Sequence, residues 1–118
     1  MTMRETTILQ TIRAALASQP GVMIWRSNTG VDLARGVRYG LGVGGADLVG
    51  IVQCATQLGP DHFGRFAAFE VKRPGGSARK NQRLWADAVR QHGGFVATVT
   101  SPESALDALR RCRLGEYQ

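Results

Sequence analysis

The triplet Glu70-Val71-Lys72 carries the residue types of a metal-dependent hydrolytic site. It closes an apolar run over residues 66–69, which is typical of a strand. Because side chains alternate between the two faces of a strand, Glu70 and Lys72 are expected on the same face. There the carboxylate would hold a divalent cation, and the ammonium would orient or help deprotonate an attacking water. Glu-x-Lys also occurs on solvated edge strands, so the triplet needs a second carboxylate.

That second carboxylate is Asp47, which opens another strand-like run over residues 47–53. Turn-forming glycine and proline residues lie between the two runs. If the runs form an antiparallel hairpin that folds near Leu58 and Gly59, Asp47 lies opposite Glu70, where facing side chains are about 5 Å apart. The spacing therefore predicts that Asp47 and Glu70 share a metal site.

Asp61 is closer in sequence to Glu70 and follows a proline, but the hairpin argues against it as a metal ligand. It belongs to the predicted turn, and the extended chain between the two residues spans up to about 30 Å. We interpret the segment around Asp61 as a surface turn.

The first predicted element is an amphipathic helix over residues 4–18, where apolar residues recur at helical spacing. Thr2-x-x-Glu5 resembles a capping box at its start. Glu5 would lie at the end of the buried stripe, where it either caps the helix or reaches the metal site. The sequence leaves both roles open.

A strand is predicted next, over residues 22–25, and polar residues follow it. Of these, Arg26 and Asn28 would either hold a phosphate or form a solvated strand end. Residues 30–45 are rich in glycine and too irregular for a packed element, which predicts a mobile loop near the substrate.

A second helix is expected from an N-cap at Ser77 to about His92. Gln82 would lie on its apolar stripe, where a buried amide needs partners. A phosphate, a metal-bound water or Lys72 could supply them, or Gln82 could be an ordinary satisfied core residue. Basic residues surround the helix start, whose free N–H groups and dipole favour a phosphate. These basic residues are Arg73, Arg79, Lys80 and Arg83.

The chain ends with a strand over residues 95–99 and a final helix that starts at Ser101 and Pro102. The helix before this strand predicts a right-handed parallel crossover from the strand of Glu70. The expected order is α-β-β-β-α-β-α, an α/β fold whose mixed sheet is flanked by helices. All 118 residues are expected to form one domain. The final helix should face inward through Ala105, Leu106, Leu109 and Cys112.

Two glycine-rich segments do not match nucleotide-binding motifs. Residues 42–47 lead into a strand instead of opening a helix. Residues 75–80 lack the Gly-Lys-Ser/Thr of a phosphate-binding loop. Nucleotide binding is therefore not expected.

The composition favours an anionic partner and argues against two other classes of protein. The net charge is +6 at pH 7, and 13 of the 15 basic residues are arginine, whose planar fork suits phosphate. Cys54 and Cys112 form neither a disulfide framework nor a zinc site with the isolated histidines, so we expect structural thiols. No apolar stretch would span a membrane and no signal peptide is recognisable, which predicts a cytoplasmic protein without membrane contact.

Together these motifs resemble the VRR-NUC domain of the PD-(D/E)XK nuclease superfamily. The resemblance runs from Glu5 to about Leu106, and the order and spacing of its motifs make it specific. It departs at Ala46, where the family usually has proline, and this change leaves the carboxylate chemistry intact. The matching segments are Gly45-Ala46-Asp47-Leu48-Val49-Gly50, Phe69-Glu70-Val71-Lys72, Gln82-x-x-Trp85 and Gly93-Gly94.

The resemblance implies a restriction-endonuclease-like fold and a set of site residues. Asp47 and Glu70 would bind the metal, with the Val71 carbonyl as a third ligand and Lys72 as the catalytic lysine. The remaining matches are Gln82 with the family's helix glutamine, Glu5 with an N-terminal helix glutamate that is a possible further metal ligand, and Arg26 and Asn28 with a polar pair after the first strand.

The activity that this resemblance implies is metal-dependent hydrolysis of DNA by an endonuclease with one or two Mg²⁺ ions, for which Mn²⁺ would substitute. Branched or structured DNA is the expected substrate. The family's small stand-alone members suggest a bacterial or phage repair nuclease, a homodimer similar to Holliday-junction resolvases.

Two other interpretations remain open. The chain could be a non-catalytic nucleic-acid-binding module with a nuclease fold, although intact Asp47, Glu70 and Lys72 argue against it. It could also be a partner-binding protein with an incidental Glu-x-Lys strand, which would bind no Mg²⁺.

Overall fold

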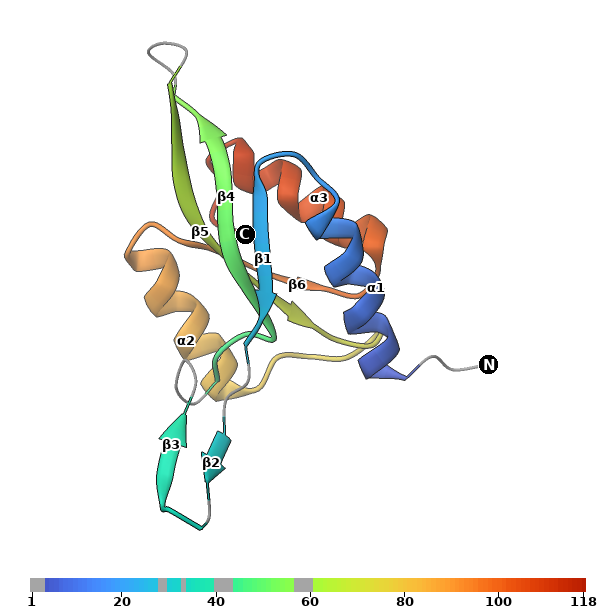
Figure 1. Cartoon of the computed structure of the whole chain (residues 1–118), viewed down its shortest axis with the longest axis vertical. Helices are drawn as coiled ribbons and strands as arrows, with labels where there is room; N and C mark the ends of the chain where they lie inside the picture. Colours follow the sequence, from blue (N-terminus) through green and yellow to red (C-terminus); the bar gives the residue numbers. More distant parts are fainter. Residues whose placement is uncertain (1–3, 28–29, 33, 40–43, 57–60) are drawn as a thin grey trace.

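The computed structural model describes residues 4–27, 30–32, 34–39, 44–56 and 61–118. Figure 1 traces the helices and strands in order from the N-terminus to the C-terminus. Their bounds are α1 (Glu5–Ala17), β1 (Val22–Arg26), β2 (Gly30–Asp32), β3 (Val37–Tyr39), β4 (Leu48–Ala55), β5 (His62–Val71), α2 (Lys80–Gln91), β6 (Phe95–Val99) and α3 (Pro102–Arg113).

The main sheet has four strands in the order β1-β4-β5-β6. β4 pairs antiparallel with β1 and with β5, whereas β5 pairs parallel with β6. The sheet is therefore mixed, as predicted. With β2 and β3 set aside, the elements follow the predicted order α-β-β-β-α-β-α, and the α/β fold is confirmed.

The β4–β5 hairpin has the register that the sequence predicts. Leu48 faces Phe69 at one end of the ladder, and Ala55 faces His62 at the other. One more step beyond Leu48 and Phe69 sets Asp47 opposite Glu70. The predicted turn residues 58 and 59 lie outside the described part of the chain.

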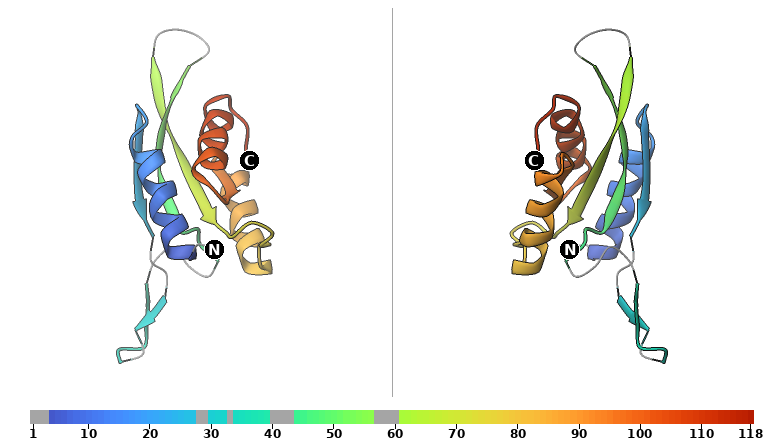
Figure 2. Two further views of the ribbon diagram at one scale, coloured as in Figure 1. Left: turned by 90° about the vertical axis from the view of Figure 1, so that its right-hand side faces the viewer. Right: turned by 90° about the vertical axis from the view of Figure 1, so that its left-hand side faces the viewer.

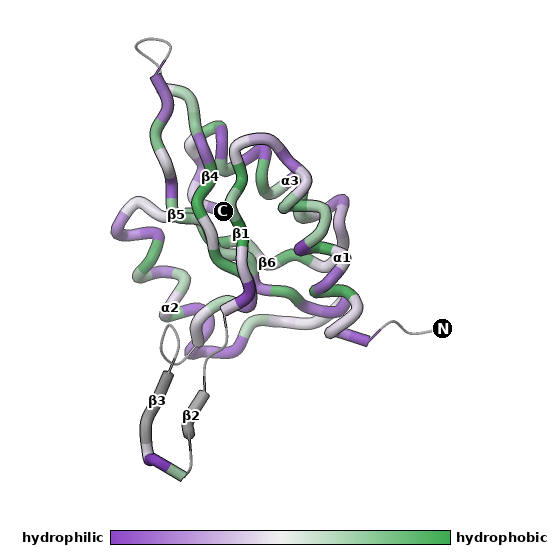
Figure 3. The backbone as a smooth tube through the Cα atoms, viewed as in Figure 1, coloured by the Kyte–Doolittle hydropathy of each residue, from purple (hydrophilic) through white to green (hydrophobic). Residues whose placement is uncertain are grey.

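The two faces of the main sheet are covered by different helices. α1 and α3 pack against each other and against one face, on the right of Figure 1. α2 lies on the opposite face, where Trp85, Ala86 and Val89 pack over Ala68 and Val96. Figure 3 shows hydrophobic residues concentrated along the strands between these helices. The larger core therefore lies under α1 and α3.

The prediction of an irregular loop over residues 30–45 was wrong. Strands β2 and β3 pair antiparallel as a separate two-stranded sheet. Between them, Gly36 adopts a φ of 65°, which a tight hairpin turn requires and glycine tolerates. Three-residue strands are too short for an alternating pattern to be recognised. Figure 2 shows this hairpin projecting beyond the main sheet.

Two predicted helix starts also need correction. α1 has Arg4 as its N-cap with no side-chain cap bond, so the predicted Thr2 capping box is wrong; Thr2 itself lies outside the described residues. α2 begins two residues later than expected, with Arg79 as its N-cap in place of Ser77. The reason is Gln82, whose Oε1 accepts a 2.9 Å hydrogen bond from the Arg79 N–H and thereby caps the helix.

The last helix begins as predicted, because Ser101 caps α3 and exchanges hydrogen bonds with Ser104. Its predicted inward face is corrected at one position. Leu106 is 37% exposed, and Ala108 is fully buried instead. Cys54 and Cys112 are buried free thiols, which agrees with a structural role. Burial raises the pKa of Cys112 to about 11, so this thiol stays protonated.

The C-terminal residues lie along the outer edge of the sheet. The Tyr117 carbonyl accepts hydrogen bonds from the Val96 N–H and from Arg90 Nε. The central carbon of the Arg65 guanidinium lies 5.1 Å from the centre of the Tyr117 ring. Arg65 is buried and also donates a hydrogen bond to the Cys112 carbonyl. In the described part of the chain, no helix has the length and apolar character that crossing a bilayer requires.

Candidate active site

Asp47 is held by both strands that flank β4. It follows the buried Ala46 and precedes the first residue of β4. Its backbone carbonyl accepts a 2.8 Å hydrogen bond from the Ser27 N–H just after β1. Its Oδ2 atom accepts a 2.8 Å hydrogen bond from the Val71 N–H at the end of β5. The carboxylate is thereby turned toward the triplet that contains Glu70.

Glu70 and Lys72 lie on one face, as strand alternation predicts. The Lys72 Nζ atom is 3.7 Å from Glu70 Oε1, and the Glu70 residue is only 7% exposed. The Lys72 N–H donates to the Val99 carbonyl, which continues the pairing of β5 with β6 past the end of β5. The ammonium is therefore fixed beside a buried carboxylate.

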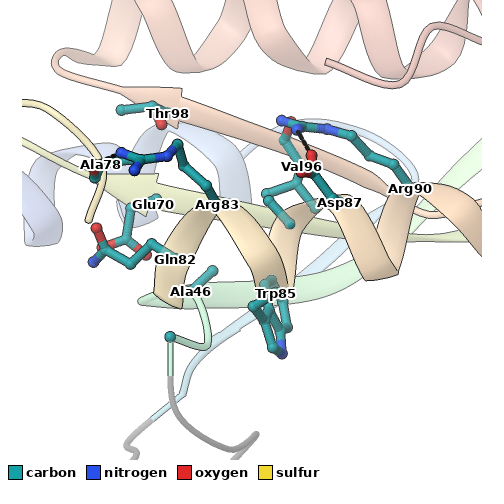
Figure 4. Close-up of a pocket in the computed structure, with 12 residues that line it drawn as sticks. Ala46, Glu70, Ala78, Gln82, Arg83, Trp85, Asp87, Arg90, Val96 and Thr98 are labelled. Carbon is teal, nitrogen blue, oxygen red and sulfur yellow. Dashed lines mark hydrogen bonds and ion pairs between the residues drawn. The ribbon is translucent and has the colours of Figure 1, made fainter. Parts of the chain in front are cut away.

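Gln82 has a partner that the sequence did not predict. Its Nε2 atom donates a 2.8 Å hydrogen bond to Glu70 Oε1, and the two side chains point toward each other in Figure 4. The expected partners were a phosphate, a metal-bound water or Lys72. Because its Oε1 also accepts from Arg79, a single amide both starts α2 and orients the carboxylate.

The surroundings of the Glu70 carboxyl favour a bound cation or a proton. Burial, and after it the nearby negative charge and hydrogen bond of Asp47, raise the pKa of the Glu70 carboxyl to about 8. Lys72 acts in the opposite direction but does not offset these effects. A divalent ion between the two carboxylates would remove both the repulsion and the need for a proton.

The donor atoms of this site fit Mg²⁺. Two carboxylates supply hard oxygen ligands, and Mg²⁺ is usually held by one or two carboxylates together with water and substrate phosphate. Among the described residues, no group of three His, Cys, Asp or Glu side chains is placed to hold a metal. Glu5 is exposed in the first turn of α1, not at the end of the buried stripe, and forms no such group with Asp47 and Glu70.

The family model of the VRR-NUC domain matches residues 4–103. The chain belongs to the VRR-NUC family. This assignment gives the mixed sheet a restriction-endonuclease-like architecture and the protein a nuclease-type function. No match was found among curated proteins or among solved structures.

The basic residues predicted to contact nucleic acid are all exposed where the structure describes them. Four of them lie around the start of α2 in this VRR-NUC domain, and Arg83 Nη1 donates a 2.6 Å hydrogen bond to the Ala78 carbonyl. Arg26 ends β1 opposite Leu48, one residue from Asp47. Asn28 lies outside the described residues. The four residues at the helix start are Arg73, Arg79, Lys80 and Arg83.

A pocket of about 160 Å³ adjoins the carboxylate site between α2 and β6. Glu70, Gln82, Arg83 and Thr98 line it, with Trp85 on its other side (Figure 4). Sequence reasoning missed Thr98. The available signal was a single polar residue within the otherwise apolar run of β6.

Asp61 is exposed immediately before β5, at the turn end of the hairpin. Its backbone carbonyl accepts a 3.0 Å hydrogen bond from the Thr56 N–H across the hairpin. Most of the length of β5 separates it from Glu70, which agrees with the interpretation of a surface turn.

Proposed function

We propose that this VRR-NUC domain is a metal-dependent DNA endonuclease that hydrolyses phosphodiester bonds. The observation that carries the proposal is the pairing of the half-buried Asp47 with the buried Glu70 beside the ammonium of Lys72. Two acidic groups are costly to bury together unless a cation or a proton compensates them. A hydrolytic metal site explains why the fold maintains this arrangement.

Asp47 and Glu70 would hold Mg²⁺, or Mn²⁺ in its place, with the Val71 carbonyl as a further ligand and Glu5 as a candidate. When bound, the ion would lower the pKa of the attacking water and neutralise charge on the phosphate. Lys72 would orient that water or stabilise the charge that develops on the phosphate. Gln82 would keep one Glu70 oxygen in place by its 2.8 Å hydrogen bond.

The DNA backbone would be bound by arginine and lysine around the carboxylates. Arg26 and Asn28 would contribute from the end of β1. Since these contacts are with phosphates, affinity should fall steeply with salt concentration. The contributing residues at the start of α2 would be Arg73, Arg79, Lys80 and Arg83.

We further propose branched or structured DNA, such as a Holliday junction, as the substrate, in replication, recombination or repair. The cytoplasm of a bacterium or of a phage-infected host is the proposed location. The sequence offers no base-reading element, so DNA shape is the feature left to recognise.

A homodimer would suit such a substrate. Its support is an exposed apolar surface on the α2 face, where Met23 faces Ile51 and Ile51 faces Phe66 across three strands. Met23 is 65% exposed, and Trp25 extends the same surface. Contiguous apolar surfaces of this kind mark association sites.

The test is cleavage of labelled four-way junction, flap, single-stranded and duplex DNA with Mg²⁺, Mn²⁺ or EDTA, for wild type and Lys72→Ala. We expect metal-dependent cutting by the wild type, strongest on a branched substrate, and its loss in the variant. Binding without cutting by either protein would instead establish the non-catalytic module. If neither binding nor cutting of DNA is observed, the interpretation as a partner-binding protein would remain.

A further inference from the structure

Thr98 is the polar residue nearest to Glu70 on the neighbouring strand. The two residues are direct partners in the parallel pairing of β5 with β6. Val96 packs beneath α2, whereas Ala97 and Val99 pack into the opposite core, so Thr98 shares the α2 face with Glu70. Thr98 is exposed, and within the described part of the chain its hydroxyl has no hydrogen-bond partner. The hydroxyl is therefore available to a ligand.

Arg83 brings a positive charge to the same place. In Figure 4 its side chain reaches over the pocket, with the guanidinium between Ala78 and Thr98. One nitrogen donates to the Ala78 carbonyl, which steadies the side chain without neutralising it. Among the described residues, no carboxylate forms an ion pair with Arg83.

Arg90 provides an internal comparison, because it lines the same pocket. Its guanidinium is engaged by Asp87 at 3.3 Å and by the Val96 carbonyl at 2.9 Å. Arg90 thus serves the fold, and Asp87 is already neutralised. The β6 side of the pocket is left with the charge of Arg83 and the hydroxyl of Thr98.

We propose that Thr98 and Arg83 form a phosphate subsite, which binds a DNA phosphate next to the one that is cleaved. This inference rests on the proposed function. A hydroxyl and a guanidinium are suitable donors for phosphate oxygens, and bonds to such charged acceptors are strong. Neighbouring strands lie about 4.8 Å apart, so Thr98 is one strand spacing from Glu70. A single DNA strand can therefore contact both residues.

The subsite also adds a path for the DNA strand to the phosphate contacts that the basic residues alone predict. A phosphate here would lie next to Glu70, where the positive charge of Arg83 would offset repulsion by the carboxylates. The cleaved strand would then pass from the carboxylates across the start of α2, and its position relative to Lys72 would be fixed by two contact points instead of one.

The experiment is DNA binding measured by fluorescence anisotropy in Ca²⁺, with the preferred substrate of the cleavage panel. Thr98→Val keeps the β-branched shape and removes only the hydroxyl, and we expect about a tenfold weaker affinity. Thr98→Ser should restore binding. Thr7→Val is the matched control, because Thr7 is also exposed but lies on α1, which covers the opposite face.

A scan with single methylphosphonate linkages identifies the phosphate. Each neutral linkage removes one negative charge, and one position next to the scissile bond should weaken wild-type binding. Thr98→Val and Arg83→Gln should both be insensitive to that same linkage. This readout separates a phosphate contact from a general loss of structure, which would leave the sensitivity unchanged.

Wild-type affinity in Thr98→Val, or sensitivity of the two variants to different linkages, would overturn the subsite. If the wild type cuts DNA while Thr98→Val binds normally, only the subsite fails. If no metal supports cutting by the wild type, the proposed nuclease activity fails. The Ca²⁺ binding data, taken with the DNA of the panel that binds most tightly, then decide only whether Thr98 and Arg83 contact the same phosphate.

Discussion

The two faces of the main sheet have different roles, although adjacent residues of the same strands form both faces. Within the described part of the chain, seventeen buried residues form the core between the sheet and helices α1 and α3. Five buried residues form the smaller core between the sheet and α2. Three of those five are Ala46, Ala68 and Ala86. The small side chains under α2 leave room for polar groups, so the thinly packed face carries the candidate site and the densely packed face carries stability.

The division is sharpest on β5, where Phe69 and Glu70 are adjacent. Phe69 is fully buried and lies 6.1 Å from Phe95, measured between ring centres. Glu70 points to the other face and meets Lys72 and Gln82. Substitutions that differ by a single position should therefore separate activity from stability.

The largest expected effect is on activity, from Glu70→Gln and Lys72→Ala. Each should lower the cleavage rate at least about 100-fold, because each removes charge from the reacting centre. Circular dichroism and thermal unfolding should show a retained fold, and most phosphate-driven DNA affinity should remain. Full activity in either purified variant would refute the site assignment.

The next effect is on stability, from Phe69→Ala. Removing this ring should cost about 3–5 kcal/mol, measured by urea unfolding, because a cavity is left in the larger core. Phe66→Ala is the matched control on the same strand, since Phe66 faces the α2 side and is 38% exposed. Equal losses in the two variants would contradict the difference between the faces.

A smaller, mixed effect is expected from Gln82→Ala. The variant loses the acceptor for the Arg79 N–H, which should cost about 1 kcal/mol of stability. It also releases Glu70, which should lower activity about 10- to 100-fold. Gln91→Ala, at the exposed end of α2, should change neither. A stability loss without an activity loss would make Gln82 only a helix cap.

The smallest expected effect is on the pH dependence of stability, which should reveal the buried carboxyl of Glu70 on the α2 face. The pKa of Glu70 is about 8 in the folded protein, against an ordinary value of 4.5. Between these values the folded state binds a proton that the unfolded state releases, so stability contributed by this group falls as pH rises through the window. In EDTA, the Tm of the wild type should drop more from pH 5.5 to 8.5 than that of Glu70→Gln. Parallel pH profiles would contradict the assignment.

Much of the fold and the core of the site could be predicted from the sequence, because strand pairing is governed by simple geometry. A reversal centred near residues 58 and 59 was enough to set Asp47 opposite Glu70, and alternation then placed Lys72. Neither step needs knowledge of distant contacts.

The failures involve side-chain contacts that residue type alone does not reveal. Ser77 is the better N-cap by residue type, yet α2 starts after Arg79 because Gln82 caps it there. Gln82 in turn meets Glu70 only because α2 crosses the sheet at this point. The place of Thr98 beside Glu70 depends on the register of β5 with β6, which no short motif encodes.

The most direct measurement compares Asp47→Asn with Asp61→Asn on the preferred DNA substrate in Mg²⁺. Each variant removes one negative charge from an aspartate at one end of the β4–β5 hairpin, so their charge and composition match. The account predicts that Asp47→Asn abolishes cleavage and that Asp61→Asn cuts at close to the wild-type rate. Cleavage that survives in Asp47→Asn and is lost in Asp61→Asn would contradict it.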